Sequence, residues 1–422
     1  MEHGRSRRRL GLVVASAAVL ATASCSDDGP EPTSSTTLQT TTTVASPVET
    51  DGRLVIGMLL PVSDARLGEP LQDAVDTAID EINIAGGVFD QAVRPIYADE
   101  GQTAAETLIA IRSLIDADVD AIVGPASSLI ALATLDEIVG AGKVVCSPTA
   151  SALALDSFPD QGLFFRTVPS DSLQARGIAQ TADQTGAQRA AIVHIDDAYG
   201  RGLATAVQSA LSGGAITSVD VIPIAPADDD LSDDVRRVVD GEAQVAIVLG
   251  DATNGPRILA ALNDLDTSGL ATVVVNDAMR NPTTPQTIAD LRTSLRSKIV
   301  GLAPQAEAMG NAAPFDPPGP FAANAFDCVN LIALGAVRAG SDAPRDIAAA
   351  FAEVSNSGQS CTSFAQCVET LSGGFQIDYN GPSGMTDISS RTGDPQRAVF
   401  DRFTFPDSTG QSAFERTVTI SG

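Results

Sequence analysis

Residues 189–202 read RAAIVHIDDAYGRG and join two different sequence patterns. The first seven residues form an apolar run of the length of a buried strand, and residues 202–212, GLATAVQSALS, show the apolar spacing of a helix. The polar segment between them therefore lies at the carboxyl end of a predicted strand. A strand followed at once by a helix is the repeating unit of parallel α/β sheets.

The same alternation extends along the chain in both directions. RLVIGMLL (residues 53–60) predicts a first strand, and residues 68–83 repeat apolar side chains every three or four positions, as in a helix that faces a sheet. One such series ends near residue 147 and a second runs from residue 172 to 277. In a chain of 422 residues, two series predict two doubly wound α/β lobes. The remaining helical and strand-like patterns fall at residues 297–302, 324–337, 346–356, 397–405 and 414–420.

Polar side chains follow several predicted strands, at the edge where doubly wound sheets bind ligands. Ser127 and Ser128 lie at a strand-to-helix junction, where hydroxyls and free backbone N–H groups can bind an anion. Thr149 and Ser151 can donate to the same anion, and Asp277, after a very apolar strand, can hold an ammonium group. Each position also has a structural alternative, because serine caps helices and aspartate closes turns.

The usual signatures of enzymes are missing from the sequence. Beyond residue 24 there is one histidine, His194, inside a predicted strand, where it reads as a core residue. No GxSxG, phosphate-loop or GxGxxG motif occurs, and the acidic run at residues 227–235 lacks the spacing of a calcium loop. We therefore expect no reaction, no cofactor and no metal.

The N-terminus has the features of an export signal. Four arginines precede an uncharged run that ends in small residues before Cys25, so we predict a signal peptide at residues 1–24 and lipidation of Cys25. A secreted protein cleaved near Ala23 is the alternative. Residues 25–51, rich in Ser, Thr and Pro, predict a disordered tether with a reach of about 25 to 30 Å.

Charge and cysteine content fit the same compartment. Removing residues 1–24 changes the formal charge from -27 to -30, which disfavours nucleic-acid binding. Four cysteines remain, and three connectivities are possible. The short spacing favours Cys361 with Cys367, which leaves Cys146 with Cys328; a metal site is the weaker alternative.

The order of the segments resembles the leucine/isoleucine/valine-binding proteins, the type I periplasmic-binding fold of ABC transporter substrate-binding lipoproteins. The likeness rests on IGMLLPVS, AIVGPASSLIALA, VVCSPTAS, LFFRTVPSD, DDAYGRG and FAANAFDCVNLIALGAV, and it covers nearly everything from Arg53 onward. It implies two lobes joined by three hinge crossovers, near residues 166–171, near 299–304 and after 384, with the ligand between the lobes. Lobe I would comprise residues 52–168 and 303–385, and lobe II residues 169–302 and 386–422.

The resemblance also assigns roles to individual residues. Ser128, beside Ser127, would grip a ligand carboxylate together with Thr149 and Ser151. Asp277 would take the ammonium group, and Tyr199 would cover the ligand from lobe II. The match is looser for the residues that would contact the ligand side chain, namely Leu67, Asp251 and Phe321.

One departure from the family concerns positive charge. The first loop reads SDARLG, and Arg66, like Arg280, would favour a ligand with a second acid if it faces the cleft. Each side chain can equally point to solvent.

The expected function is capture of an amino acid, branched-chain or related, for delivery to an ABC permease. The protein would be a monomer, exported and anchored to the outer face of the cytoplasmic membrane by Cys25. A surface sensor of the same fold is the first alternative. A metal-dependent enzyme using Asp196, Asp197 and Tyr199 is the second.

Overall fold

The computed structural model describes residues 50–304, 319, 321–384 and 387–422. The predicted signal peptide, Cys25 and all of the predicted tether except residues 50–51 lie outside this part of the chain. The two large sheets described below belong to one compact unit.

The first sheet contains five parallel strands in the order β2-β1-β3-β4-β5. This 2-1-3-4-5 order is one of the common doubly wound orders. Every residue of β1, β3, β4 and β5 is buried, as expected for parallel strands covered on both faces, whereas the edge strand β2 is partly exposed. The strands are β1 (Val55–Leu60), β2 (Arg94–Asp99), β3 (Ala121–Val123), β4 (Val144–Ser147) and β5 (Phe164–Arg166).

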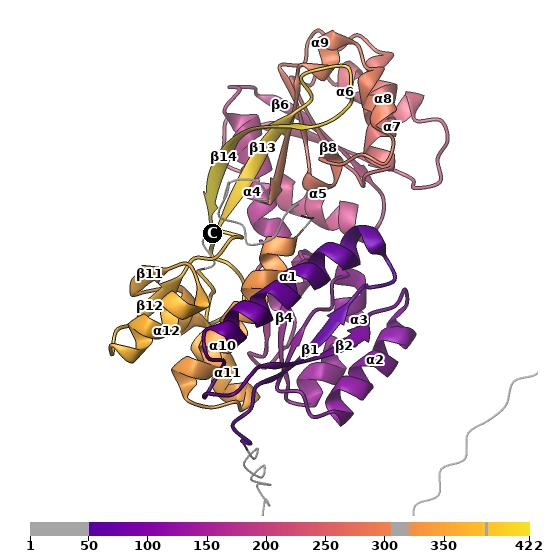
Figure 1. Cartoon of the computed structure of the whole chain (residues 1–422). Coiled ribbons are helices and arrows are strands. Elements are labelled where there is room, and N and C mark those ends of the chain that lie inside the picture. The colour runs from indigo at the N-terminus through magenta and orange to yellow at the C-terminus, as the bar shows by residue number, and fades with distance from the viewer. Residues whose placement is uncertain (1–49, 305–318, 320, 385–386) are drawn as a thin grey trace, which may run out of the picture. The chain divides into compact units, whose positions relative to one another are not determined.

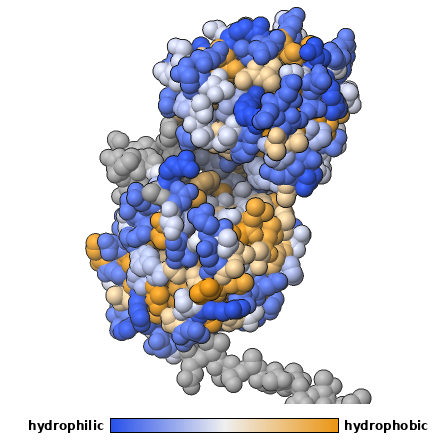
Figure 2. Space-filling model, turned by 90° about the vertical axis from the view of Figure 1, so that its right-hand side faces the viewer, coloured by the Kyte–Doolittle hydropathy of each residue, from blue (hydrophilic) through white to orange (hydrophobic). Residues whose placement is uncertain are grey.

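The helices of this lobe come from two distant parts of the chain. Helix α10 packs on α1 and α11 and also contacts β3 and β4, although it follows all the parallel strands of the second sheet in sequence (Figure 1). On the face shown in Figure 2, apolar side chains gather mainly over this lobe. The elements are α1 (Ala65–Ile84), α2 (Ala104–Asp116), α3 (Ser128–Gly140), η1 (Leu153–Ser157), α10 (Ala322–Ala339) and α11 (Pro344–Ser355).

The second sheet repeats the order of the first and then extends it. Strands β7-β6-β8-β9-β10 are parallel, and β13 and β14 add an antiparallel ribbon beyond β10. The parallel lobe that the sequence predicts is therefore a mixed sheet, because the last two strands are joined directly by a short loop and need no crossover helix. The strands are β6 (Arg189–Ile195), β7 (Ser218–Ile224), β8 (Val245–Leu249), β9 (Thr272–Val275), β10 (Ile299–Pro304), β13 (Arg397–Thr404) and β14 (Ala413–Ser421).

Helices α4 and α5 pack against each other on this second lobe. None of the helices in the described ranges is long and apolar enough to span a membrane. The elements are α4 (Asp171–Asp183), α5 (Ala198–Ala210), α6 (Ser232–Asp240), α7 (Asn254–Asn263), η2 (Asp277–Met279), α8 (Pro285–Ala289) and α9 (Thr293–Arg296).

The chain passes between the two lobes three times. It leaves the first lobe after β5, returns to it between β10 and α10, and leaves it again before β13. The predicted fold, two α/β lobes joined by three crossovers, is confirmed.

The sequence patterns missed a small substructure that packs on α10 and α11 at the side of the first lobe (Figure 1). Strands β11 (Gln359–Cys361) and β12 (Ile377–Tyr379) form a two-stranded parallel sheet, and α12 (Phe364–Ser372) lies between them. A three-residue strand is too short to show a period. The Cys361–Cys367 disulfide closes this turn, and Cys146 pairs with Cys328, which is the pairing that the spacing favoured.

Candidate functional site

The junction between β3 and α3 brings Ser127 and Ser128 to the carboxyl edge of the first sheet. Gly124 makes the turn possible, because its φ is +113° and a Cβ there would lie 2.0 Å from the Leu59 carbonyl oxygen. Ser127 caps α3 and accepts a hydrogen bond from the Ile130 N–H. The Ser128 hydroxyl accepts from the Ala152 N–H at 3.2 Å and keeps its own proton for another partner.

The buried carboxylate of Glu100 already occupies part of the predicted anion site at this junction. Glu100, 1% exposed, accepts hydrogen bonds from the N–H groups of Ala126 at 2.7 Å and Ser127 at 2.9 Å. Burial raises the pKa of Glu100, and these two bonds oppose the rise. Two N–H groups at this junction are thus used inside the protein, which leaves the Ser128 hydroxyl as the better candidate for ligand binding.

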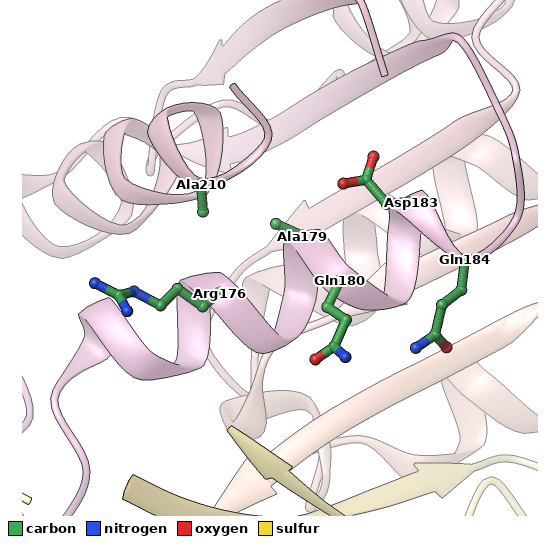
Figure 3. Close-up of a pocket in the computed structure, with 6 residues that line it drawn as sticks. All are labelled: Arg176, Ala179, Gln180, Asp183, Gln184 and Ala210. Atoms are coloured by element: carbon green, nitrogen blue, oxygen red, sulfur yellow. The ribbon is translucent and has the colours of Figure 1, made fainter. Parts of the chain in front are cut away.

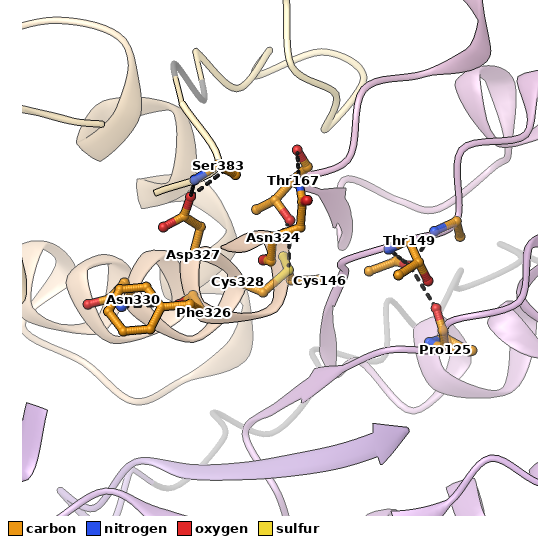
Figure 4. The surroundings of a disulfide bond; sticks show 12 residues. Pro125, Cys146, Thr149, Thr167, Asn324, Phe326, Asp327, Cys328, Asn330 and Ser383 are labelled. Atoms are coloured by element: carbon orange, nitrogen blue, oxygen red, sulfur yellow. Dashed lines mark hydrogen bonds between the residues drawn. A yellow bond between two sulfur atoms is a disulfide. The ribbon is translucent and has the colours of Figure 1, made fainter. Parts of the chain in front are cut away.

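The loop after β4 is fixed to the same junction. The Thr149 hydroxyl donates to the Ala126 carbonyl, and the Ser147 hydroxyl donates to the Pro125 carbonyl at 2.6 Å. Figure 4 shows this loop beside the Cys146–Cys328 disulfide, which ties the end of β4 to α10. Ser151 follows, and its carbonyl accepts from the Asp171 N–H at the start of α4, so the loop reaches the second lobe.

Tyr199 lies in the first turn of α5, not in a turn before the helix. The helix begins at Ala198, four residues earlier than the pattern predicts, because Asp197 caps it by accepting from the Gly200 N–H at 2.7 Å. A Cβ at Gly200 would lie 2.0 Å from the Ile195 carbonyl oxygen, so the close approach of helix to strand requires glycine.

The hypothesis of a metal-dependent enzyme needs free carboxylates at Asp196 and Asp197, but both have partners inside the protein. Asp197 is committed to the helix cap, and Asp196 forms an exposed ion pair with Arg201 at 2.8 Å. Within the described ranges, no group of three or more His, Cys, Asp or Glu side chains is placed to hold a metal ion. His194 is buried, with Nδ1 2.8 Å from the Ile195 carbonyl oxygen.

Near Tyr199, the negative charges of two buried carboxylates, Asp277 and Asp171, act on each other. Asp277 follows β9, and its Oδ1 is buried without a hydrogen-bond partner among the described residues. Burial raises the pKa of Asp277, while hydrogen bonds, first that of Gln174, oppose the rise. Asp171, 4% exposed, has its pKa raised to about 8 by burial and by the negative charge of Asp277.

Tyr199 completes this group. Its hydroxyl accepts from the Asn276 side chain at 3.5 Å. Burial raises the Tyr199 pKa well above its usual value, and the charges of Asp277 and Asp171 add to the effect. The phenol therefore stays neutral beside the two acids.

A small cavity of about 10 Å³, close to the space that one water molecule needs, lies between these acids and residues of the other lobe. It contains three of the predicted ligand residues, Ser151, Asp277 and Phe321, together with Asp171. The remaining lining residues are Val168, Pro169, Gln174, Pro304 and Phe400.

The other predicted residues have local roles. Leu67 is half-buried against the core of the first lobe. Asp251 is exposed and caps α7 by accepting from the N–H groups of Thr253 and Asn254, both at 2.7 Å. No contact in the described structure brings Asp251 to the acid pair.

Neither arginine considered for a second ligand acid is unpaired. Arg66 has an exposed side chain 4.0 Å from Asp64. Arg280 is nearly buried and forms an ion pair with Asp401 at 2.9 Å. The support for a diacid ligand is therefore removed.

Sequence reasoning missed Asp171 and Gln174 as site residues. Both lie on the inner face of α4, directly after the crossover segment TVPS, which we interpreted only as a connection. An acid in the first turn of a helix reads as favourable for the helix dipole, so nothing in the sequence marks Asp171 as buried.

A second pocket lies on the surface of the second lobe and is a poor candidate. Figure 3 shows its Arg176, Gln180 and Gln184 side chains extending from α4 without meeting at one point. Asp183 is already used, since it accepts from the Ile216 N–H. The polar groups therefore do not converge on a ligand.

The chain belongs to the periplasmic binding protein family, whose sequence profile matches residues 54–399. This class consists of extracytoplasmic binding proteins with a type I fold and not of enzymes.

Two relatives indicate the range of roles within that class. The chain is 27% identical to the chemotactic signal transduction system substrate-binding protein BasB of Halobacterium salinarum, over 80% of this chain and 84% of BasB. It is 28% identical to the Leu/Ile/Val-binding protein BraC3 of Rhizobium johnstonii, over 68% of this chain and 80% of BraC3.

Solved structures share the fold. An ABC transporter substrate-binding protein of Desulfitobacterium hafniense in complex with Leu superposes with a TM-score of 0.67 at 19% identity, covering 86% of this chain and all of that one. The branched-chain amino acid binding protein LivJ of Streptococcus pneumoniae in complex with isoleucine gives 0.64, also at 19% identity, covering 88% and 100%.

Removing the charge of Asp171 should stabilise the ligand-free protein at high pH. The folded-state pKa of about 8 lies above the unfolded value of about 3.9, so the folded state loses stability as the pH rises through this range. Asp171→Asn should raise the free energy of unfolding by at least about 1.4 kcal/mol near pH 9, the equivalent of one pKa unit, and have little effect below about pH 4. Chemical denaturation at both pH values measures this, with Asp73→Asn, an exposed aspartate on α1, as the control. Equal or lower stability of the Asp171 variant near pH 9 would contradict the conclusion that burial and the Asp277 charge disfavour the ionised form of Asp171.

Proposed function

We propose that this protein is an exported solute-binding protein that captures an α-amino acid between its lobes and delivers it to an ABC importer. The observation that carries the proposal is the buried Asp277 oxygen without a partner beside the nearly buried Asp171. Two buried carboxylates that lie close together repel each other, and an ammonium group relieves this repulsion. Family membership supports binding rather than catalysis.

The two lobes supply complementary halves of an amino-acid site. On lobe I the Ser128 hydroxyl keeps a proton that it can donate to a ligand carboxylate. The Thr149 proton is used on the Ala126 carbonyl and the Ser151 hydroxyl interacts with Asp171, so in this proposal these two residues line the site beside Ser128. On lobe II Asp277 and Asp171 suit the ammonium, and Tyr199 covers the ligand. In this proposal the side chain of the ligand lies near Phe321 and Leu67, both half-buried and apolar.

The remaining parts of the proposal concern the whole molecule. Lobe I takes residues 52–168 and 303–385, and lobe II takes residues 169–302 and 386–422. A monomer attached to the outer face of the cytoplasmic membrane through Cys25 would reach its permease on the tether of residues 25–51.

A panel of ligand fragments tests the site chemistry by thermal shift. L-Leucine, L-isoleucine or L-valine at 100 times its dissociation constant should stabilise the protein by about 2.7 kcal/mol. 4-Methylpentanoate, which lacks the amine, and 3-methylbutylamine, which lacks the carboxylate, should give no shift at the same concentration. A shift with aromatic acids alone would overturn the amino-acid assignment, and no shift with any solute would overturn solute binding itself.

A sensor of the same fold is the second candidate, favoured by the similarity to BasB. Uptake of labelled ligand by cells with and without the protein separates the two. Lost uptake supports the importer, and retained uptake with a lost behavioural response supports the sensor.

A further inference from the structure

Arg166, the last residue of β5, is fully buried, and all three guanidinium nitrogens are used. Nε donates to Asp394 Oδ1 at 2.7 Å, Nη2 bonds to Asp156, and Nη1 donates to the carbonyls of Ala150 at 3.1 Å and Ala152 at 3.3 Å. One side chain thus joins the end of β5 to the preceding loop at residues 150–156 and to Asp394, which is 228 residues away in sequence.

Two of these segments connect the lobes, and the third carries ligand residues. Asp394 lies in the third crossover, and Arg166 itself begins the first. The carbonyls of Ala150 and Ala152 flank Ser151, whose own carbonyl accepts from Asp171. The Ser151 loop is therefore bonded, through Arg166, to the first and third crossovers.

Further contacts reinforce the same connection. Ser170, in the first crossover, donates to Asp156 at 2.7 Å and caps α4 by accepting from the Ser172 N–H. The Arg166 N–H donates to the Gly393 carbonyl at 3.0 Å. At Gly393 a Cβ would lie 2.0 Å from the Phe164 carbonyl oxygen, so the first and third crossovers are in close contact here.

A buried ion pair is costly to break, because each separated partner is left without solvent or countercharge. The loop cannot shift against the crossovers without breaking bonds to Arg166. From this geometry we propose that Arg166 is a positioning residue, which holds the Ser151 loop in its binding arrangement by anchoring it to the first and third crossovers. The role of the loop in binding rests on the proposed function, whereas the anchoring does not.

Arg166 also acts on the site through its charge. It lowers the pKa of Asp171 against the effect of burial, while Asp277 and Asp156 raise it, and Tyr199 and Asp394 lie in the same group of interacting residues. A neutral residue at position 166 should therefore move the pH at which Asp171 ionises upward, and a lysine should restore it.

Hydrogen exchange in the ligand-free protein tests the anchoring without any ligand. In Arg166→Lys, which cannot reach all four acceptors, the amides of Asp171 and Ala152 should exchange at least roughly tenfold faster, while the amide of Ile247 in β8 keeps its rate. Asp394→Asn should show the same local pattern to a smaller extent. Arg296→Lys is the matched control, since Arg296 is buried and also donates to two carbonyls, those of Ala289 and Leu291, away from the loop.

Titration of leucine binding against pH tests the positioning role. Arg166→Gln should weaken binding and shift its pH midpoint upward, and Arg166→Lys should restore the midpoint while binding remains weak. Wild-type exchange rates at Asp171 and Ala152 in both Arg166→Lys and Asp394→Asn would overturn the proposal. Faster exchange that includes Ile247 would also overturn it, because it would show a general stabilising role. Absence of leucine binding to the wild type would overturn the proposed function and leave the exchange result standing.

Discussion

Replacing both Cys146 and Cys328 by alanine should lower the free energy of unfolding by about 5 kcal/mol. The two cysteines are 182 residues apart, and the closed loop contains the whole parallel part of the second sheet. A crosslink limits the conformations of the unfolded chain more as the loop becomes longer. Both side chains are buried, so alanine avoids the unsatisfied hydroxyl that serine would introduce.

The second disulfide provides the matched control. Cys361 and Cys367 are 6 residues apart, and their replacement by alanine should cost about 2 kcal/mol on the same loop-entropy argument. Urea denaturation of the two double variants under non-reducing conditions gives the comparison. If the short-loop variant loses as much stability as the long-loop variant, loop entropy is not the source of the stabilisation.

Asp277→Asn should weaken the binding of a branched-chain amino acid by roughly ten- to a hundredfold, which corresponds to the loss of a hydrogen bond to a charged group. The substitution keeps the shape of the side chain and removes its charge. It also relieves the repulsion between Asp277 and Asp171 in the ligand-free protein, which further reduces the gain on binding an ammonium. Isothermal titration calorimetry with L-leucine measures the change.

Two comparisons make this result specific. Asp342→Asn removes another carboxylate that is 2% exposed and has one oxygen without a partner in the described structure, but it lies beside Gly52 and Arg53 at the amino-terminal end of β1. That variant should bind leucine as the wild type does. With 4-methylpentanoate the substitution should cause no loss of affinity. Asp277→Asn should bind this amine-free acid at least as well as the wild type does. Unchanged leucine affinity in Asp277→Asn would show that Asp277 is only a turn residue.

The sequence predicted the fold well where a pattern repeats over a whole element. Strand β6 begins and ends where the run at residues 189–195 does, because every residue after the exposed Arg189 is buried in a covered sheet. The start of α5 was predicted too late, because an aspartate at the cap and a glycine in the first turn also read as a loop. Strands β11 and β12 were missed, since three residues carry too little pattern.

Residues of the candidate site could be proposed from the sequence when they follow a strand, but not when their place in the site comes from burial. Asp277 follows an apolar strand and was identified by that position. Glu100 and Asp171 look like ordinary surface acids in the sequence, and only the fold brings the Ala126 N–H to one and the charge of Asp277 to the other. Arg166 could be placed at a crossover, yet its four acceptors come from segments that the sequence does not connect.

Asp342 fixes the point at which the amino-terminal segment is attached to the folded lobe, and a force that pulls on this segment acts first at that point. Its carboxylate holds the N–H groups of Gly52 and Arg53, just before β1, whereas the candidate ligand loops lie at the opposite, carboxyl ends of the strands. Tension applied through residue 50 is therefore taken up at the base of β1 and α11, away from the face where solutes are captured. A protein immobilised by its amino terminus on a bead or sensor chip should keep that face accessible.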